Sequence, residues 1–351
     1  MTDDDEILTG EEEEESPRES TGAAFGPSEG QGAAGEFSLD QERLLAPVPG
    51  ENPAGESLRY EGTYDLIKEA REEEADLPQG VWERELKRAD WKKVKEICLE
   101  ALENRTKDLQ ITVWLLESLL RLHGFAGVKE GMRLLMGLCE RFWDHLYPEI
   151  EEDDLESRVS PFYWMNEKLY YELKMIRITQ PDSVDATPYT WADWEAAGRI
   201  ENLALKDKNI LQDAESKGKA TRAKFLGSVM FTPKHFYESQ LDCLETSIQV
   251  TRDLEHFLDE KCGRQAPSLK QFRDTLDDIR RLVHDFLMEK REEDEEVELG
   301  VDEGQQPFFD EEEEGEDVGQ KHGIGKIRSR RDAYRMLSAA ADYLLIHEPH
   351  S

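Results

Sequence analysis

The sequence predicts an all-α protein, and three observations lead to this fold class. Apolar residues recur every three or four positions through most of the chain after residue 90, which is the spacing of one helix face. Capping residues such as Asp and Thr stand before these stretches, and Gly or Pro follows them. We find no convincing run of alternating apolar and polar residues, the pattern of a half-buried strand. We therefore expect an N-terminal helical bundle and then a second helical region with a long antiparallel helical hairpin.

The N-terminal bundle is predicted to occupy residues 39–180. Asp90 caps a helix with one apolar face, and Asp108 caps a helix that is apolar on most sides and stops at Gly124. A third helix ends before Pro148. Because the connections are short, the three helices should be antiparallel neighbours.

Aromatic residues at helical spacing are expected to form much of this core. Trp91, Trp114 and Trp143 each fall on an apolar helix face. An aromatic-rich pattern over 162–178 predicts a fourth helix that packs across the first three.

The second helical region is predicted at 188–290. Thr190 and Asp193 form a capping-box-like start. The highly charged stretch 206–224 fits either an exposed helix or a mobile arm.

A long helical hairpin is the clearest local signal in the chain. Thr232 and Pro233 suit the N-cap and first helical position, and Gly263 suits the end of that helix. Ser268 then starts a partner helix whose apolar stripe keeps 3/4 spacing to residue 286.

Acidic residues are concentrated at two places. The net charge is −36, yet residues 1–40 hold 13 acids and one base, and residues 291–320 hold 15 acids and one base. We read 1–38 as a disordered acidic tail, either simply solvated or docking on a basic partner. We read 291–325 as an acidic linker before a short helical region at 326–351.

Composition also limits the partners and the compartment. No basic cluster is large enough to follow a phosphate backbone, so we expect no nucleic-acid partner. The acidic N-terminus is unlike a signal peptide, and no stretch approaches the roughly 18 uncharged apolar residues of a membrane span. The four cysteines are scattered and fit buried free thiols. We expect a cytoplasmic protein that does not insert into a membrane.

Motifs for catalysis and cofactor binding are incomplete. The Gly-Ile-Gly-Lys stretch at 323–326 lacks the spacing and the Ser/Thr of a phosphate loop. The acidic residues at 310–315 begin like a calcium loop, but its twelfth position is Lys321 instead of Glu. We therefore predict no catalytic residue, cofactor or metal site.

Several motif blocks occur in order over about 130 residues. A Pro/Gly-rich strap, which we define as residues 44–60, ends in Leu-Arg-Tyr. Asp-Trp-Lys-Lys-Val follows at 90–94, although Ala89 stands where a Pro is typical. Arg-Thr-Lys-Asp-Leu at 105–109 and Phe-Trp-Asp-His-Leu-Tyr-Pro at 142–148 complete the series. Together these blocks resemble the ImpA N-terminal domain of the TssA/ImpA family of type VI secretion systems.

This resemblance extends beyond the first domain. Residues 189–193 and 258–269 are similar to the middle part of many TssA proteins, and 327–351 is similar to the start of their C-terminal region. The family usually continues further, so the resemblance implies a chain short of its ring-forming module. We expect self-association no larger than dimers or similarly small assemblies.

The resemblance implies a non-catalytic assembly subunit of a bacterial type VI secretion system. Its partners would be the baseplate, the membrane complex and the tail tube or sheath, to which a cytoplasmic protein could be recruited. Two alternatives stay open, an acidic chaperone-like or mimic protein and a hydrolase with an unrecognised carboxylate site. The family-motif residues, expected in structural or interaction roles, are Pro47, Pro53, Gly55, Leu58, Arg59, Tyr60, Asp90, Trp91, Lys107, Asp108, Trp143 and Pro148.

Overall fold

The computed structural model describes residues 37–74, 86–150, 154–183, 186–207 and 209–301, and side-chain surroundings up to residue 292. These residues form helices joined by loops, with only isolated β-bridges and no sheet, so the predicted all-α fold is confirmed. Residues 1–36 of the predicted acidic tail and the predicted helical region 326–351 lie outside them. The α-helices are α1 (Gln41–Leu44), α2 (Thr63–Arg71), α3 (Trp91–Asn104), α4 (Leu109–Phe142), α5 (Glu156–Lys174), α6 (Trp191–Ala204), α7 (Asn209–Ser216), α8 (Arg222–Phe231), α9 (Lys234–Cys262) and α10 (Lys270–Val301).

Helix α4 is two helices that fold back on each other at Gly124. Gly124 has φ 58° and ψ −138°, which breaks the helix. A Cβ atom on Gly127 would lie 2.1 Å from the carbonyl oxygen of Leu119, and a Cβ on Gly131 would lie 2.6 Å from a methyl carbon of Leu116. In one straight helix, residues 119 and 127 would be about 12 Å apart. The two halves are therefore the antiparallel neighbours expected from the sequence, in contact through small residues.

The same helix is long and apolar enough to cross a membrane by composition alone. However, 78% of its most apolar window is buried inside the protein. Each half spans only about 22–27 Å, less than the roughly 30 Å of a hydrocarbon core. Its composition is that of a core helix, since α3, α5 and α9 pack around it.

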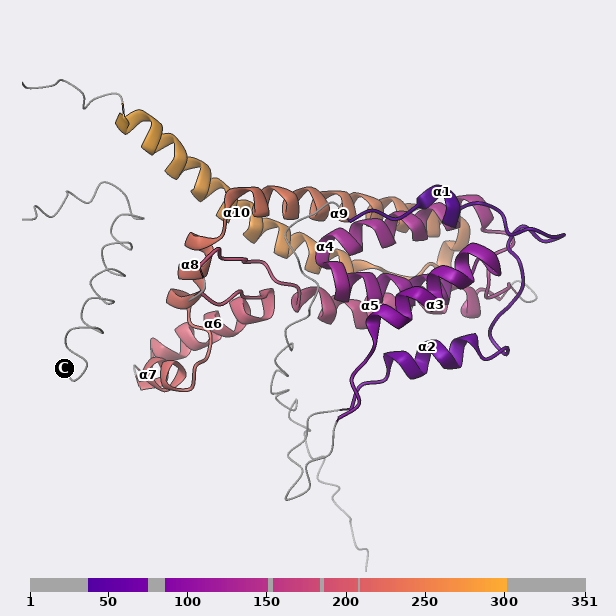
Figure 1. Ribbon diagram of the computed structural model, residues 1–351, viewed down its shortest axis with the longest axis horizontal. Helices are drawn as coiled ribbons and strands as arrows, with labels where there is room; N and C mark the ends of the chain where they lie inside the picture. Colours follow the sequence, from indigo (N-terminus) through magenta and orange to yellow (C-terminus); the bar gives the residue numbers. More distant parts are fainter. Residues whose placement is uncertain (1–36, 75–85, 151–153, 184–185, 208, 302–351) are drawn as a thin grey trace, which may run out of the picture.

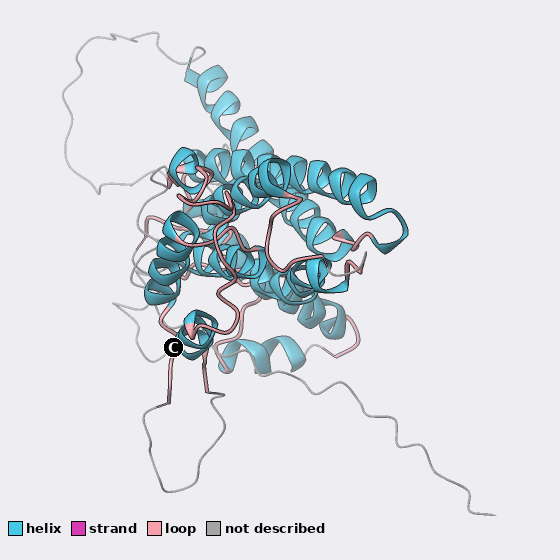
Figure 2. Ribbon diagram, turned by 90° about the vertical axis from the view of Figure 1, so that its right-hand side faces the viewer, coloured by secondary structure: helices cyan, strands magenta, loops and turns pink. Residues whose placement is uncertain are grey.

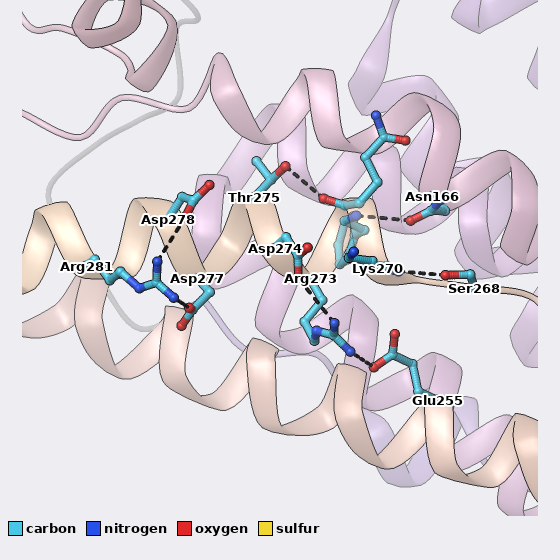
Figure 3. Close-up of polar contacts among 12 residues, drawn as sticks. Asn166, Glu255, Ser268, Lys270, Arg273, Asp274, Thr275, Asp277, Asp278 and Arg281 are labelled. Atoms are coloured by element: carbon cyan, nitrogen blue, oxygen red, sulfur yellow. Dashed lines mark hydrogen bonds and ion pairs between the residues drawn. The ribbon is translucent and has the colours of Figure 1, made fainter.

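The long hairpin of α9 and α10 packs along the bundle (Figures 1 and 2). Helix α9 lies on α4, and α10 lies on α5. At the start of α10, the backbone N–H of Phe272 donates to Oδ1 of Asn166 at 3.1 Å, as Figure 3 shows. An ion pair of Arg273 with Glu255 joins the two arms of the hairpin. The hairpin and the bundle therefore share one continuous core.

Helices α6, α7 and α8 form a side lobe below α10 in Figure 1. The lobe is attached through an aromatic cluster in which Trp194 and Phe225 pack against Phe286 of α10. The Thr190 capping box is present as predicted, with the Asp193 N–H donating to Oγ1 of Thr190 at 3.2 Å. The predicted boundary between a first domain ending at 180 and a second starting at 188 stays a prediction.

Two details differ from the sequence-based expectation. Pro233, not Thr232, is the N-cap of α9, because the Thr232 hydroxyl donates back to the carbonyl of Ser228 at 2.8 Å. Helix α10 continues to Val301, into the segment expected to be an acidic linker. Glu has a high helix propensity, which favours this extension. The predicted buried free thiols are confirmed for all four cysteines.

We predict that Gly127→Ala destabilises the protein by about 1–3 kcal/mol, because the added methyl group overpacks the contact with the Leu119 backbone. Gly227→Ala is the matched control, since a Cβ there meets nothing within 4 Å and Ala is favoured over Gly in a helix. Urea unfolding of both variants measures the effect. Equal stability of the two variants would contradict the close contact between the two halves of α4.

Candidate functional site

The motif residues meet where the strap crosses the loop between α3 and α4. The backbone N–H of Glu56 donates to the carbonyl of Arg105 at 3.0 Å, and the N–H of Lys107 donates to the carbonyl of Ala54 at 2.7 Å. Gly55 has φ 75°, and a Cβ there would lie 2.0 Å from the Arg105 carbonyl oxygen. Only glycine allows the two backbones to approach this closely.

Lys107 is fully buried at this crossing. Its Nζ donates to the carbonyl oxygens of Leu44 at 2.8 Å and Leu102 at 2.6 Å, and lies 5.9 Å from the centre of the Phe142 ring. Burial lowers the Lys107 pKa to about 8. The ammonium group thus satisfies one backbone carbonyl at the start of the strap and one in the last turn of α3. At the C-terminal end of α3, its positive charge also interacts favourably with the helix dipole.

Asp108 caps the first half of α4 from a buried position. One carboxylate oxygen accepts the backbone N–H groups of Gln110 at 2.8 Å and Ile111 at 3.1 Å. The other accepts the hydroxyl of Tyr64 at 2.8 Å, so the cap also holds α2. Burial raises the Asp108 pKa to about 6, against the opposing effect of these hydrogen bonds.

A second buried cation holds the segment after α4. The guanidinium of Arg158 donates to the carbonyls of Pro148 and Leu146, each at 2.6 Å, and to the carbonyl of Trp143. It also lies 5.2 Å from the centre of the Trp143 ring. The peptide bond between Tyr147 and Pro148 is cis. Arg158 therefore fixes the Trp143–Pro148 turn through three free carbonyls.

The Trp143–Pro148 turn joins the crossing through Tyr147. Its hydroxyl donates to the carbonyl of Gly55 at 3.1 Å and accepts from the amide of Asn52 at 3.1 Å. Its backbone pairs with Lys107 and Leu109 on either side of Asp108. Three stretches that are far apart in sequence thus form one hydrogen-bonded knot around 52–56, 105–109 and 143–148.

The strap also places two motif residues on the surface. Leu58 is buried and anchors the strap, whereas Arg59 is exposed and Tyr60 is 89% exposed. The Arg59 guanidinium lies 5.7 Å from the centre of the Tyr60 ring. Arg105 forms an ion pair with Glu61 at 2.7 Å, which holds the backbone next to Tyr60. Tyr60 is the most exposed large apolar side chain among the described residues.

Not every predicted site residue reaches this knot. Pro47 is exposed and Pro53 is half-buried; the Pro53 carbonyl accepts the N–H of Val48 at 2.9 Å. Asp90 and Trp91 lie at the opposite end of α3, about 20 Å away along its axis. There Asp90 caps the helix, and the half-buried Trp91 contacts the guanidinium of Arg121 at 5.0 Å.

Sequence reasoning missed Arg158 and Tyr64. A buried basic residue on an apolar helix face is the available signal for Arg158, because such a charge needs acceptors. Tyr64 carried no local signal, since its partner Asp108 is 44 residues away. The charged groups of Lys107, Asp108 and Arg158 are hydrogen-bonded to backbone carbonyls, backbone amides or the Tyr64 hydroxyl. They therefore hold the backbone in place and are not presented to a ligand.

The comparisons with known proteins cover the same residues. A family model described as ImpA, N-terminal, type VI secretion system matches residues 45–167, which include every predicted site residue. The type VI secretion system component TssA1 of Pseudomonas aeruginosa is 29% identical over 116 residues, a third of this chain and a third of that protein. The chain therefore aligns with only about a third of the length of this curated relative.

A solved structure gives the broader match. It is the N-terminal domain, including the conserved ImpA_N region, of the TssA component of the type VI secretion system from Burkholderia cenocepacia. The two chains are 31% identical, with a TM-score of 0.64, over 74% of this chain and 98% of the other.

We predict that Arg158→Lys destabilises the protein by about 1–3 kcal/mol, because a lysine ammonium cannot reach three carbonyls in the fork geometry of a guanidinium. Arg264→Lys, on an exposed residue after α9, is the control and should be neutral. Thermal and urea unfolding measure both. A neutral Arg158→Lys would show that the turn is held by other contacts.

The Asp108 pKa predicts a pH dependence. The folded protein binds the Asp108 proton more tightly than the unfolded chain, so this residue makes the free energy of unfolding fall as pH rises from about 4 to 6. The loss reaches at most about 3 kcal/mol. Asp108→Asn, which keeps the cap acceptor, should flatten the profile in this window. Parallel wild-type and variant profiles would contradict a raised pKa.

Proposed function

Because the chain belongs to the TssA/ImpA family of type VI secretion system components, we propose that it is a non-catalytic assembly subunit whose N-terminal bundle docks on other secretion proteins. The proposed partners are the baseplate, the membrane complex and the tail tube or sheath. We place the subunit on the cytoplasmic side of the apparatus. One observation carries the proposal: the family match covers residues 45–167, and the hydrogen-bonded knot at 52–56, 105–109 and 143–148 lies within them.

The buried family-motif residues support a structural role. Lys107, Asp108 and Trp143 hold helix ends and loops together and offer no free functional group. TssA/ImpA is not a known enzyme family. Among the described residues, no group of three or more His, Cys, Asp or Glu side chains could hold a metal ion. The structural roles of the motif residues and the family membership favour assembly over the hydrolase alternative.

We further propose that Arg59 and Tyr60 form the docking point. Tyr and Arg are the residue types most enriched in the energetic centres of protein interfaces. Here they stand next to each other on a backbone that is fixed by Leu58 on one side and by the Arg105–Glu61 ion pair on the other. A rigid, exposed aromatic loses little conformational entropy on binding.

Tyr60→Ala is expected to weaken binding to the docking partner by at least about 30-fold, as truncation of an interface centre does. Tyr171→Ala removes another exposed tyrosine, from α5, and should leave binding unchanged. Binding of the full chain to purified sheath, tube, baseplate and membrane-complex subunits measures this, with unfolding curves to show that both variants fold. The subunits to be tested are those encoded by genes that neighbour the gene of this protein.

Two results separate the parts of this proposal. Equal binding by both tyrosine variants would show that the docking point lies elsewhere on the protein. If the wild-type chain bound none of these subunits, the assembly role itself would be wrong.

A further inference from the structure

The side lobe carries exposed leucines that nothing in the described structure covers. Leu203 is 51% exposed, Leu205 is 83% exposed and Leu211 is 40% exposed. They lie at the end of α6 and in the first turn of α7, on either side of one short connection. Helix α6 buries only Ala197 and α7 buries only Ala214. Such short helices with little buried surface are marginal without a further contact.

Basic residues outnumber acidic ones in the chain around these leucines, since residues 203–224 hold six bases and three acids. Lys206, Lys219 and Lys224 are exposed, and none forms an ion pair with another described residue. The lysines stand beside Leu205, after α7 and in the first turn of α8. We call Leu203, Leu205, Leu211 and these three lysines the lobe surface. An apolar and basic surface is unusual in a chain with a net charge of −36.

The complementary sequence lies in the same chain, shortly after α10. Residues 302–317 contain nine acids and no base. Within them, Phe308 and Phe309 are followed directly by five consecutive acids, Asp310 to Glu314. The pattern combines two large apolar side chains with dense negative charge, which matches both features of the lobe surface.

The chain geometry allows this segment to return to the side of the lobe where α8 meets α10. Nζ of Lys290 in α10 donates to the carbonyl of Met230 in α8 at 2.9 Å, so α10 passes the lobe at this residue. Helix α10 then runs on to Val301, about 16 Å further. Seven residues from Val301 to Phe308 span up to about 25 Å, which is enough to return to the level of Lys290. A tether this short gives an effective concentration of order millimolar.

We propose that the lobe surface binds the segment 307–314 of the same chain. Phe308 and Phe309 cover the exposed leucines, and the acids at 310–314 pair with Lys206, Lys219 and Lys224. The contact would bury the apolar face of α6 and α7 and so stabilise the lobe. The proposal does not depend on the docking role of Tyr60.

Zero-length carbodiimide cross-linking of the full chain at low concentration tests this. We expect carboxylates of 310–314 to link to Lys206, Lys219 or Lys224 within one molecule. Phe308→Ala with Phe309→Ala, or Leu205→Ser, should reduce these links about ten-fold, because a buried apolar side chain contributes more than 1.4 kcal/mol. Lys92→Glu, an exposed change on α3, is the control and should have no effect.

Four results would overturn the proposal. Links from 310–314 only to Lys321 or Lys326 would assign the acids to the neighbouring basic stretch. Links between isotope-labelled and unlabelled copies would assign the lobe surface to a second molecule. Undiminished links in the phenylalanine and leucine variants would show charge attraction without docking, and a complete absence of links to the lobe would leave it for another protein.

Discussion

The N-terminal bundle depends on two buried cations that satisfy backbone carbonyls at helix ends. Lys107 donates to one carbonyl of the strap and one in the last turn of α3, and Arg158 donates to three carbonyls that follow α4. The last carbonyls of a helix have no partner inside the helix and carry partial negative charge. A side chain from another segment can therefore cap the helix and fix the crossing of two loops at once. In this way Lys107 joins segments that are 63 residues apart without a sheet.

The reversal at Gly124 makes this arrangement possible. Because the two halves of α4 are of similar length, folding back brings Asp108 at one end next to Tyr147 beyond the other. The backbone N–H of Leu109 then donates to the carbonyl of Tyr147 at 2.8 Å. Close contact at Gly127 and Gly131 keeps the halves in register. A wider hairpin would separate the residues that form the knot.

Local features of the fold could be predicted from the sequence, because they depend on neighbouring residues. The caps at Asp90, Asp108 and Thr190 follow from side-chain acceptors placed before apolar stretches. The role of Thr232 could not be predicted, because its hydroxyl could cap the start of α9 or donate to a carbonyl of α8. Only the tertiary structure shows that it donates to Ser228 of α8. The surroundings of Arg158 are likewise set by tertiary contacts. The motif match singled out Lys107 and Tyr60, but it did not indicate that Lys107 is buried and Tyr60 exposed.

The attachments at the N-terminal end of the described chain also have a mechanical consequence. Phe37 stacks on His123, Gln41 donates to the carbonyl of Glu130 and Leu44 accepts from Lys107, so the segment 37–44 that leads into the strap is attached at three separate points. A pull on the chain before Phe37 loads these attachments one after another, as in peeling. Tyr60 lies beyond all of them. A load applied at the N-terminal end of the described chain would meet these three attachments before it reached the backbone around Tyr60.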